Sequence, residues 1–571
     1  MTDIRKSKSI RDLIIKSEKD DLSSIARLAK YYRQGKFVQQ DDEISEKYTQ
    51  KLERIFLSEK MKLRLRDVRI INLRGITDIE LKTSNNNNVT VLIGNNGTGK
   101  TTILDAILKS LNLIRRGIES DNKNFSAGTA IDIGDIRKGK GVSTSSIKCT
   151  YQLDENNYYI SELNQAITGT DLKSYSDHSE LSTLTYIYRV INSRKTDLGL
   201  PLVAYYPVER SVTMSRSDAE RIIQSTFKNK TWSKYDGYAL ALSEKNNFEL
   251  FISWFRYIDD ILGHVGMELN ELIQRKASLT NDYDNLKKLI KNKELQAAGD
   301  VFTNSLNMLN ASIARVTEQI NTIESSSEDK IKYKHTLDFV AKAIYEFLPN
   351  ISNLRIEKIP EFDLVADKIN PNGEKTTISI NSLSQGEKTL ISLIGDIARR
   401  LVLLNPITAL NVNDSPLNGH GIVLIDEIDL HLHPKWQQSV IPKLTKTFPN
   451  IQFILTTHSP IVISTVHHDS VKILQDGGIR NSIKGTLGAK ASRVMNENFY
   501  VDDRYPELNE TKKLNKYKDL VYNDEWNTPL AKSLREELKS NFIDEEDEIN
   551  ELDLYIEARK WELEVLNEKN K

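Results

Sequence analysis

The sequence is nearly devoid of cysteine. Cys149 is the single cysteine among 571 residues, so the chain cannot form an internal disulfide or a cysteine-based zinc site. This shortage fits a reducing cytoplasm, which is the expected location. Long hydrophobic runs are also missing, and none approaches the ~20 apolar residues that cross a bilayer. The polar residues 1–9 lead into no apolar stretch, so neither a signal peptide nor a membrane contact is predicted.

An excess of charge of either sign is missing as well. Lys plus Arg number 79 and Asp plus Glu number 80, which gives a formal net charge of −1. This balance excludes a globally basic protein that coats DNA and a protein dominated by an acidic tail, but it permits local basic patches. The length of the chain exceeds what one hydrophobic core usually serves, so roughly two to four domains are expected.

Changes of pattern along the chain predict five regions. Residues 1–60 are helical and resemble half of a Sel/TPR-like repeat, which must pack on the body or on a copy of itself, or recognise a separate partner. Heptad spacing between residues 266 and 325 predicts an antiparallel helical hairpin with arms of only ~40 Å. The expected regions are 1–60 (N-terminal extension), 61–265 (first α/β lobe and start of a helical lobe), 266–345 (hairpin insertion), 346–470 (second α/β lobe) and 471–571 (helical, partner-binding C-terminus).

A glycine-rich loop lies between a predicted strand at residues 89–93 and a predicted helix at residues 103–111. It fits G-x-x-x-x-G-K-[ST] and, with the residue that follows, comprises Gly94, Asn95, Asn96, Gly97, Thr98, Gly99, Lys100, Thr101 and Thr102. Glycines let backbone N–H groups curl around phosphate oxygens, and a helix start favours negative charge. Lys100 is placed to neutralise the β- and γ-phosphates, and the Thr101 hydroxyl to bind Mg²⁺.

Two further motifs complete the chemistry. The hydrophobic run 421–425 predicts a strand that ends in Asp426 and Glu427, the first placed to hold Mg²⁺ through water and the second to polarise an attacking water. Between the motifs, Ser384, Gln385, Gly386 and Glu387 begin a helix expected to reach residue 404. Such a helix start is a second phosphate nest. Because one nucleotide needs only one nest, the economical arrangement is two chains head to tail, each closing over the other's loop.

These motifs, in this order, resemble the ABC-type ATPases of the SMC, RecF and OLD-like branch. The segment Leu455–Pro460 is similar to the switch-histidine loop of that branch. The resemblance implies an α/β fold, namely an ABC-type P-loop ATPase head with a helical lobe and a short helical hairpin, which binds ATP and Mg²⁺. It implies that Lys100, Glu427 and His458 are catalytic, with His458 sensing the γ-phosphate, and that Thr101 and Asp426 bind the metal.

Two features depart from that pattern. A glutamine normally follows the first lobe, but the corresponding segment 203–210 has none, so Glu209 or Arg210 would substitute. The D-loop position falls near His433 instead of at an aspartate. The His431/His433 pair, with three further histidines nearby in sequence, leaves a zinc site as a less favoured alternative.

No Toprim-like pattern of acids follows Pro460, so no nuclease is expected in the same chain. An ABC-type head, a short hairpin, no nuclease and a helical tail together resemble the PtuA ATPases of Septu and retron-associated anti-phage systems. That resemblance implies a homodimer or larger assembly that gates a separate PtuB-like HNH endonuclease, and in a retron also a reverse transcriptase with its noncoding RNA and msDNA. The alternatives are a RecF/SMC-like DNA-repair ATPase and a nucleotide-sensing scaffold that does not hydrolyse ATP.

Candidate DNA contacts are two lysine clusters, which could neutralise phosphates without reading sequence. They comprise Lys287, Lys288, Lys291 and Lys293 on the hairpin, and Lys512, Lys513, Lys516 and Lys518 near the C-terminus. Solvated helix faces are the competing interpretation. Tyr555 and Trp561, on a predicted terminal helix at residues 551–567, are a candidate partner surface or a face that packs on the body.

Overall fold

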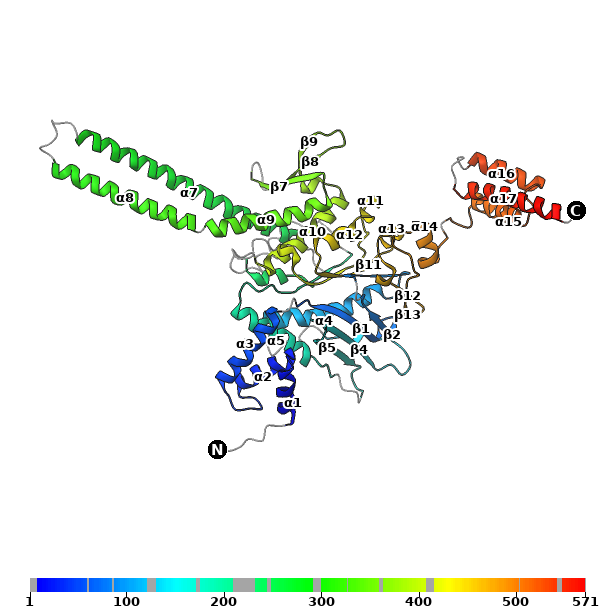
Figure 1. Cartoon of the computed structure of the whole chain (residues 1–571), viewed down its shortest axis with the longest axis horizontal. Coiled ribbons are helices and arrows are strands. Elements are labelled where there is room, and N and C mark those ends of the chain that lie inside the picture. Colours follow the sequence, from blue (N-terminus) through cyan, green and yellow to red (C-terminus); the bar gives the residue numbers. More distant parts are fainter. Residues whose placement is uncertain are drawn as a thin grey trace. The chain divides into compact units, whose positions relative to one another are not determined.

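The computed structural model describes residues 8–58, 61–84, 87–120, 130–170, 175–208, 232–243, 248–290, 299–325, 327–358, 363–406, 415–502, 504–541 and 547–569. The chain divides into two compact units, Met1–Gly488 and Ala489–Lys571, whose elements are labelled in Figure 1. Within the described ranges, no helix combines the length and the apolar character needed to cross a membrane.

A six-stranded sheet forms the centre of the first unit, in the order β13-β12-β3-β11-β10-β6. Its strands are β3 (Val89–Gly94), β6 (Leu202–Tyr206), β10 (Gly421–Ile425), β11 (Ile451–Thr456), β12 (Val471–Gln475) and β13 (Gly478–Asn481). All neighbours are parallel except the β12–β13 pair. Every residue of β3, β6, β10 and β11 is buried, as continuous apolar runs in parallel strands require. The carboxyl ends of β3, β10 and β11 therefore open at one edge.

Two antiparallel sheets flank this centre. One has the order β2-β1-β4-β5 and comprises β1 (Arg64–Leu73), β2 (Ile76–Lys82), β4 (Thr144–Gln152) and β5 (Tyr158–Ala166). The other comprises β7 (Ile351–Glu357), β8 (Asp363–Ile369) and β9 (Lys375–Ser379). The helix α4 (Lys100–Glu119) contacts strands of both larger sheets, and α10 (Gln385–Leu404) follows β9. This arrangement confirms the predicted α/β class.

The predicted hairpin is confirmed by α7 (Phe248–Ile290) and α8 (Gly299–Ser325), which lie side by side and project from the head (Figure 1). A third helix, α9 (Ser327–Phe347), leads back from the arm. The arm helix begins well before the expected boundary at residue 266. Its first turns belong to the core, because Phe248, Phe251 and Phe255 are buried. The ring of Phe251 stacks on Phe248 with centroids 6.2 Å apart and meets Phe255 edge to face at 6.1 Å.

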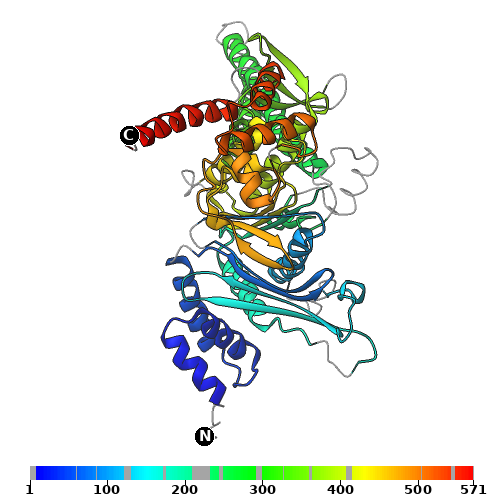
Figure 2. The same cartoon turned by 90° about the vertical axis from the view of Figure 1, so that its right-hand side faces the viewer.

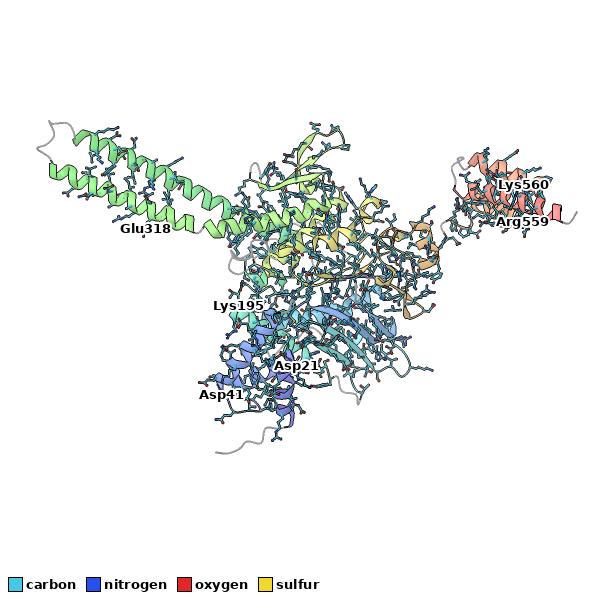
Figure 3. The ribbon with its side chains drawn as sticks, in the orientation of Figure 1. Asp21, Asp41, Lys195, Glu318, Arg559 and Lys560 are labelled. Carbon is cyan, nitrogen blue, oxygen red and sulfur yellow. The ribbon has the colours of Figure 1, made fainter. Side chains whose placement is uncertain are left out.

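The N-terminal extension folds as α1 (Lys8–Glu18), α2 (Leu22–Gln34) and α3 (Asp42–Ser58), seen together at the N-terminal end in Figure 2. Asp21 and Asp41, labelled in Figure 3, accept hydrogen bonds from the first turns of α2 and α3 at 2.8 and 2.9 Å. The helices pack on α5 (Ser179–Arg194), where Phe56 meets Tyr188 edge to face. Of the expected alternatives, the extension takes the one in which it packs on the body.

The second unit is helical and has its own core. It comprises α14 (Ala491–Val494), a π-turn at Met495–Phe499, α15 (Asn509–Tyr522), α16 (Pro529–Asn541) and α17 (Asp547–Lys569). Leu514, Trp526 and Leu538 are buried between these helices. The expected boundary at residue 471 lies inside the central sheet, because β12 and β13 occupy residues 471–481. These two strands are short and have weak alternation, so a helical interpretation of the polar region missed them.

Candidate functional site

The glycine-rich loop has backbone angles that only glycine adopts easily. Gly94, Gly97 and Gly99 have φ values of 152°, 80° and 101°. A Cβ atom at Gly94 would lie 2.6 Å from the carbonyl oxygen of Leu474. Gly99 is the N-cap of α4 and provides no side-chain hydrogen bond, so the first N–H groups of α4 are left for another acceptor. The loop is thus shaped for an anion.

Lys100 lies folded over this loop. Its Nζ donates hydrogen bonds to the carbonyl oxygens of Gly94 at 2.8 Å and Asn95 at 3.0 Å, and the residue is only 8% exposed. Burial lowers the pKa of Lys100, while Asp426 and Glu427 act in the opposite direction. The ammonium group is therefore held where an incoming phosphate would be placed, and its charge is only partly hydrated.

Asp426 connects three elements at the same edge of the sheet. Its carboxylate, 1% exposed, accepts a hydrogen bond from the Thr101 hydroxyl at 3.0 Å and another from the Thr456 hydroxyl. Thr101 begins α4, and Thr456 is the last residue of β11. Carboxylate and hydroxyl oxygens are hard ligands of the kind that Mg²⁺ prefers. The donor set formed by Thr101 and Asp426 thus fits the predicted magnesium ion.

Glu427 is held in an unusual backbone conformation. Its φ is 47°, in the left-handed region, which costs a non-glycine residue about 1 kcal/mol or more. The conformation is fixed because the Glu427 N–H donates to the Thr456 hydroxyl at 2.7 Å, and the next N–H, of Ile428, donates to the Thr456 carbonyl at 3.0 Å. Thr456 therefore holds the Asp426 carboxylate and the Glu427 backbone, a role that the sequence analysis missed. A hydroxyl at the end of an otherwise apolar buried strand was the available signal.

His458 follows β11 and is exposed at the same edge. The residues on either side of it are fixed: the Thr457 hydroxyl donates to Asp429 at 2.5 Å, and the Ser459 hydroxyl donates to Gln437 at 2.7 Å. The imidazole thus projects from a rigid turn. The first residues of α4, Lys100 and Thr101, therefore lie at the same edge of the sheet as Asp426, Glu427 and His458, which follow β10 and β11.

The Ser384–Glu387 turn is satisfied within its own chain. Ser384 is the N-cap of α10, and its N–H and hydroxyl donate to the Glu387 carboxylate at 3.0 and 2.8 Å. Lys368 lies 2.8 Å from the same carboxylate. Burial would raise the pKa of Glu387, but Lys368 and Ser384 outweigh it and lower the pKa. Among the described residues, no hydrogen bond of this turn reaches the loop at 94–102.

Gly386 is required by close packing. A Cβ atom there would lie 2.6 Å from the carbonyl oxygen of His431 and 2.8 Å from the ring of Trp436. An open hollow beside Ser384 is lined by His431, His433 and Lys435. His431 has a φ of 62°, and His433, at the expected D-loop position, caps the short helix α11 (Pro434–Gln437). The turn and the segment after Glu427 thus form one surface.

The segment expected to replace the missing glutamine is only partly visible. Strand β6 pairs with β10 in the central sheet, as the sequence order requires, but Glu209 and Arg210 lie outside the described residues. Tyr206, the last residue of β6, donates its hydroxyl to Asp396 on α10 at 2.8 Å. Asp396 also binds Arg399 and Arg400, all fully buried. This buried network joins the end of β6 to the helix that begins at Ser384.

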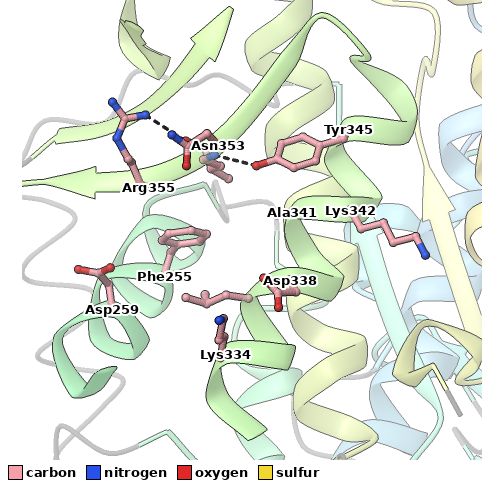
Figure 4. A pocket seen from close by; sticks show the side chains of 11 residues that line it. Phe255, Asp259, Lys334, Asp338, Ala341, Lys342, Tyr345, Asn353 and Arg355 are labelled. Carbon is pink, nitrogen blue, oxygen red and sulfur yellow. Dashed lines mark hydrogen bonds between the residues drawn. The ribbon is translucent and has the colours of Figure 1, made fainter. Parts of the chain in front are cut away.

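A second hollow of about 360 Å³ lies where the arm meets the three-stranded sheet (Figure 4). Its walls come from α7, α9 and β7, and include Phe255, Tyr345 and Arg355. The Tyr345 hydroxyl accepts a hydrogen bond from the Leu354 N–H at 2.7 Å, which fixes β7 to α9. This hollow lies at the base of the arm, outside the set of motifs described above.

The two predicted lysine clusters have different surroundings. Lys512, Lys513 and Lys518 all pair with glutamates of the C-terminal unit, so most of that cluster is neutralised. On the arm, the Lys287 ammonium lies 5.6 Å from the centre of the Tyr283 ring, whereas Lys291 and Lys293 lie outside the described residues. Trp561 on α17 is 67% exposed. Trp561 therefore remains a candidate contact for a partner protein.

Comparisons with known proteins identify a family and several similar chains. Residues 61–463 match the family described as "AAA ATPase domain". The chain is 35% identical over 556 residues to "Retron Ec83 probable ATPase" of Escherichia coli, covering 97% of both chains. It is 33% identical over 137 residues to "Septu protein PtuA" of Bacillus mycoides (strain KBAB4), covering 23% of this chain and 18% of that one. The Smc head domain of Pyrococcus furiosus, solved bound to the C-terminal domain of ScpA, is 16% identical with a TM-score of 0.36, covering 73% of this chain and 96% of that one.

Proposed function

Because the chain belongs to the AAA ATPase domain family and is an ATPase, we propose that it is the ATP-hydrolysing subunit of an anti-phage defence complex of the retron or Septu type. One observation carries the proposal at the chemical level. The Thr101 and Thr456 hydroxyls meet on the buried Asp426 carboxylate, beside a glycine loop with an uncapped helix start. This is the arrangement that positioning a nucleoside triphosphate requires.

In the proposed reaction, the N–H groups of the loop and the start of α4 bind the phosphates. Lys100 exchanges its carbonyl partners for phosphate oxygens and neutralises their charge. Thr101 and Asp426 hold Mg²⁺, which when bound stabilises charge on the phosphates. Glu427 orients a water for attack, helped by the fixed left-handed backbone at that residue. His458 contacts the γ-phosphate from the end of β11.

The proposed assembly is a head-to-tail homodimer or a larger oligomer. Its support is the Ser384–Glu387 turn, whose hydrogen bonds among the described residues leave the loop of the same chain untouched. The turn and the hollow lined by His431, His433 and Lys435 offer a surface to the nucleotide of a second copy. ATP then orders the dimer, and hydrolysis releases it.

The proposed partners are those that the resemblance to PtuA ATPases implies. A separate HNH endonuclease of the PtuB type is gated by the ATP-ordered dimer, and in a retron setting a reverse transcriptase with its noncoding RNA and msDNA joins the complex. The similarity over nearly the full length to a retron ATPase favours the retron setting. Trp561, exposed on α17, is the candidate contact for such a partner.

The dimer is tested with Glu427→Gln, because this substitution removes the base and leaves the phosphate loop intact. With ATP and Mg²⁺, light scattering should show a dimer that persists, whereas the wild type returns to the smaller species as ATP is consumed. Glu155→Gln, at an exposed residue away from the site, is the matched control and should behave as the wild type. A Glu427→Gln variant that binds ATP and stays monomeric would contradict the head-to-tail assembly.

The defence role is tested by co-purification of the chain expressed with its neighbouring genes. An HNH protein in the complex supports nuclease gating, and a reverse transcriptase with branched RNA–DNA identifies a retron effector. DNA-stimulated ATP hydrolysis by a homodimer without either partner would instead support the repair-type ATPase. ATP binding without turnover would support the sensing scaffold.

A further inference from the structure

The second helix of the N-terminal extension, α2, has basic side chains and no acidic ones. Residues 22–40 contain four basic side chains and no Asp or Glu, in a chain whose net charge is −1. Arg27, Lys30 and Arg33 recur at every third residue of α2, and Lys36 follows its last turn. Helix residues three apart are neighbours on the surface, so these cations form a continuous line.

The cations at the exposed end of this line are not neutralised. In the ranges that the structure describes, Lys30, Arg33 and Lys36 form no ion pair with an acid. Two acids of α3, Glu46 and Glu53, are bound by Arg194 at 3.0 and 2.6 Å, whereas Asp42 and Glu43 lie in the first turn of that helix. The contrast with the C-terminal lysines is direct, because those pair with glutamates. An uncompensated line of cations attracts a polyanion.

Aromatic rings alternate with these cations. The Lys30 ammonium lies 5.1 Å from the centre of the Tyr186 ring on α5, and the Arg189 guanidinium lies 5.9 Å from the same ring. The Lys36 ammonium lies 5.2 Å from the centre of the Phe37 ring. Each cation–π contact fixes a long side chain, which reduces the entropy lost on binding a ligand.

Phe37 occupies an unfavourable position. Its side chain is 64% exposed, and its φ is 65°, a conformation that bulky residues rarely adopt. Tyr31 supports the ring edge to face, with centroids 5.1 Å apart. An exposed ring on a left-handed backbone does little for the core, so it points to a function on the surface.

We propose that this α2 ridge, defined as Lys30, Arg33, Lys36 and Phe37, binds single-stranded nucleic acid. The three cations neutralise consecutive phosphates, and an unstacked base stacks on the open face of Phe37. A single strand is favoured over a duplex because only unpaired bases present their flat faces to a protruding ring. The inference does not rest on the proposed dimer, because the ridge lies in the N-terminal extension and needs no nucleotide.

The electrostatic part is tested by fluorescence anisotropy with the full chain and a fluorescein-labelled oligothymidylate of about 20 nucleotides. The triple variant Lys30→Gln, Arg33→Gln and Lys36→Gln should weaken binding at least about tenfold at 0.1 M salt and lower the salt slope by about 2. The triple variant Lys138→Gln, Lys140→Gln and Lys148→Gln, at exposed lysines with no assigned role, changes the net charge equally and should bind as the wild type.

The stacking part is tested with Phe37→Gly. Glycine accepts the positive φ, so the thermal midpoint should stay the same or rise, while binding weakens about fivefold or more with an unchanged salt slope. Phe37→Tyr keeps a ring and should bind as the wild type. Loss of affinity without loss of stability is an outcome that a purely structural Phe37 would not produce.

Three outcomes would overturn the proposal. The first is a wild-type chain that does not bind the oligonucleotide. The second is a ridge variant that binds as tightly as the wild type, or a control variant at Lys138, Lys140 and Lys148 that loses as much affinity. The third is a duplex of the same length that competes as well as the single strand, which would remove the role assigned to Phe37.

Discussion

The helices α4 and α10 both begin at glycine-containing phosphate motifs, but their first N–H groups are satisfied in different ways. The N-cap of α4 is Gly99, which has no side chain to accept a hydrogen bond. The N-cap of α10 is Ser384, whose side chain and Glu387 form a closed capping box. The first N–H groups of α4 are left for an external acceptor such as an anion, whereas the start of α10 is capped within the chain.

This difference separates the two steps of the proposed cycle. In the proposed cycle, the α4 start, with Lys100 beside it, binds the phosphates within a single chain. The α10 start is stable by itself and presents a preformed surface, so it adds to binding only when a second copy supplies the nucleotide. Variants at the two starts should therefore separate ATP binding from assembly, and the predictions below are ordered by expected size.

The largest effect is expected for Lys100→Ala. Removing the ammonium from a buried phosphate site should lower the rate of ATP hydrolysis about 10³-fold and abolish ATP binding. Steady-state hydrolysis and equilibrium binding of a fluorescent ATP analogue measure both effects. Lys148→Ala, at an exposed strand residue, is the matched control and should leave both unchanged. A Lys100→Ala variant with wild-type affinity would show that α4 is not the nucleotide site.

An intermediate effect is expected for Gly386→Ala. The added methyl group meets the His431 carbonyl oxygen and the Trp436 ring, so the turn must shift. Stability should fall by about 1–3 kcal/mol, and hydrolysis by about 10²-fold, while ATP binding at α4 is kept. Urea unfolding and the same two assays give these values. Gly75→Ala, with open space around its Cβ position, should change none of them. Loss of ATP binding would mean that the two helix starts are not independent.

The smallest effect concerns pH. The folded-state pKa of Glu387 lies below its ordinary value of 4.5, so the ionised carboxylate stabilises the fold above about pH 4.5, and this contribution is lost as the pH falls through the lowered pKa. Glu387→Gln should therefore lower the free energy of unfolding by about 1 kcal/mol at pH 7 and by progressively less in acid. Denaturant unfolding across pH measures the difference, with Glu155→Gln as the control. A difference that does not change with pH would exclude an ionic role for Glu387.

The motifs were the part of the site that sequence could predict. Lys100, Thr101 and Asp426 were expected because glycine spacing and strand ends have few alternative explanations, and a hydrogen bond joins Thr101 to Asp426. Thr456 was not expected, because a threonine in an apolar strand is ordinary until the strand order places it between two carboxylates.

The sequence predicted the main parts of the fold but not the places where these parts join. Heptad spacing predicted the arm, but the aromatic core around Phe251 and Trp254 joins the head and the arm in one helix, which periodicity cannot divide. The strands β12 and β13 were missed because both are short. In addition, β12 pairs with β3, which is distant in sequence, and with β13, whose residues alternate only weakly between polar and apolar. The absence of acidic residues from the segment 22–40 can be seen in the sequence, but the exposure of the Phe37 ring cannot.

The contacts of Lys100 have a kinetic consequence. Its ammonium group donates to the carbonyl oxygens of Gly94 and Asn95, so contacts within the chain hold the loop in its curved shape. Nucleotide binding is then an exchange of hydrogen-bond acceptors and not a folding event. The affinity for nucleotide therefore reflects how much more strongly the Lys100 ammonium group binds phosphate oxygens than the carbonyl oxygens that it gives up. Binding therefore requires no prior ordering of the loop, which removes a step that would slow association.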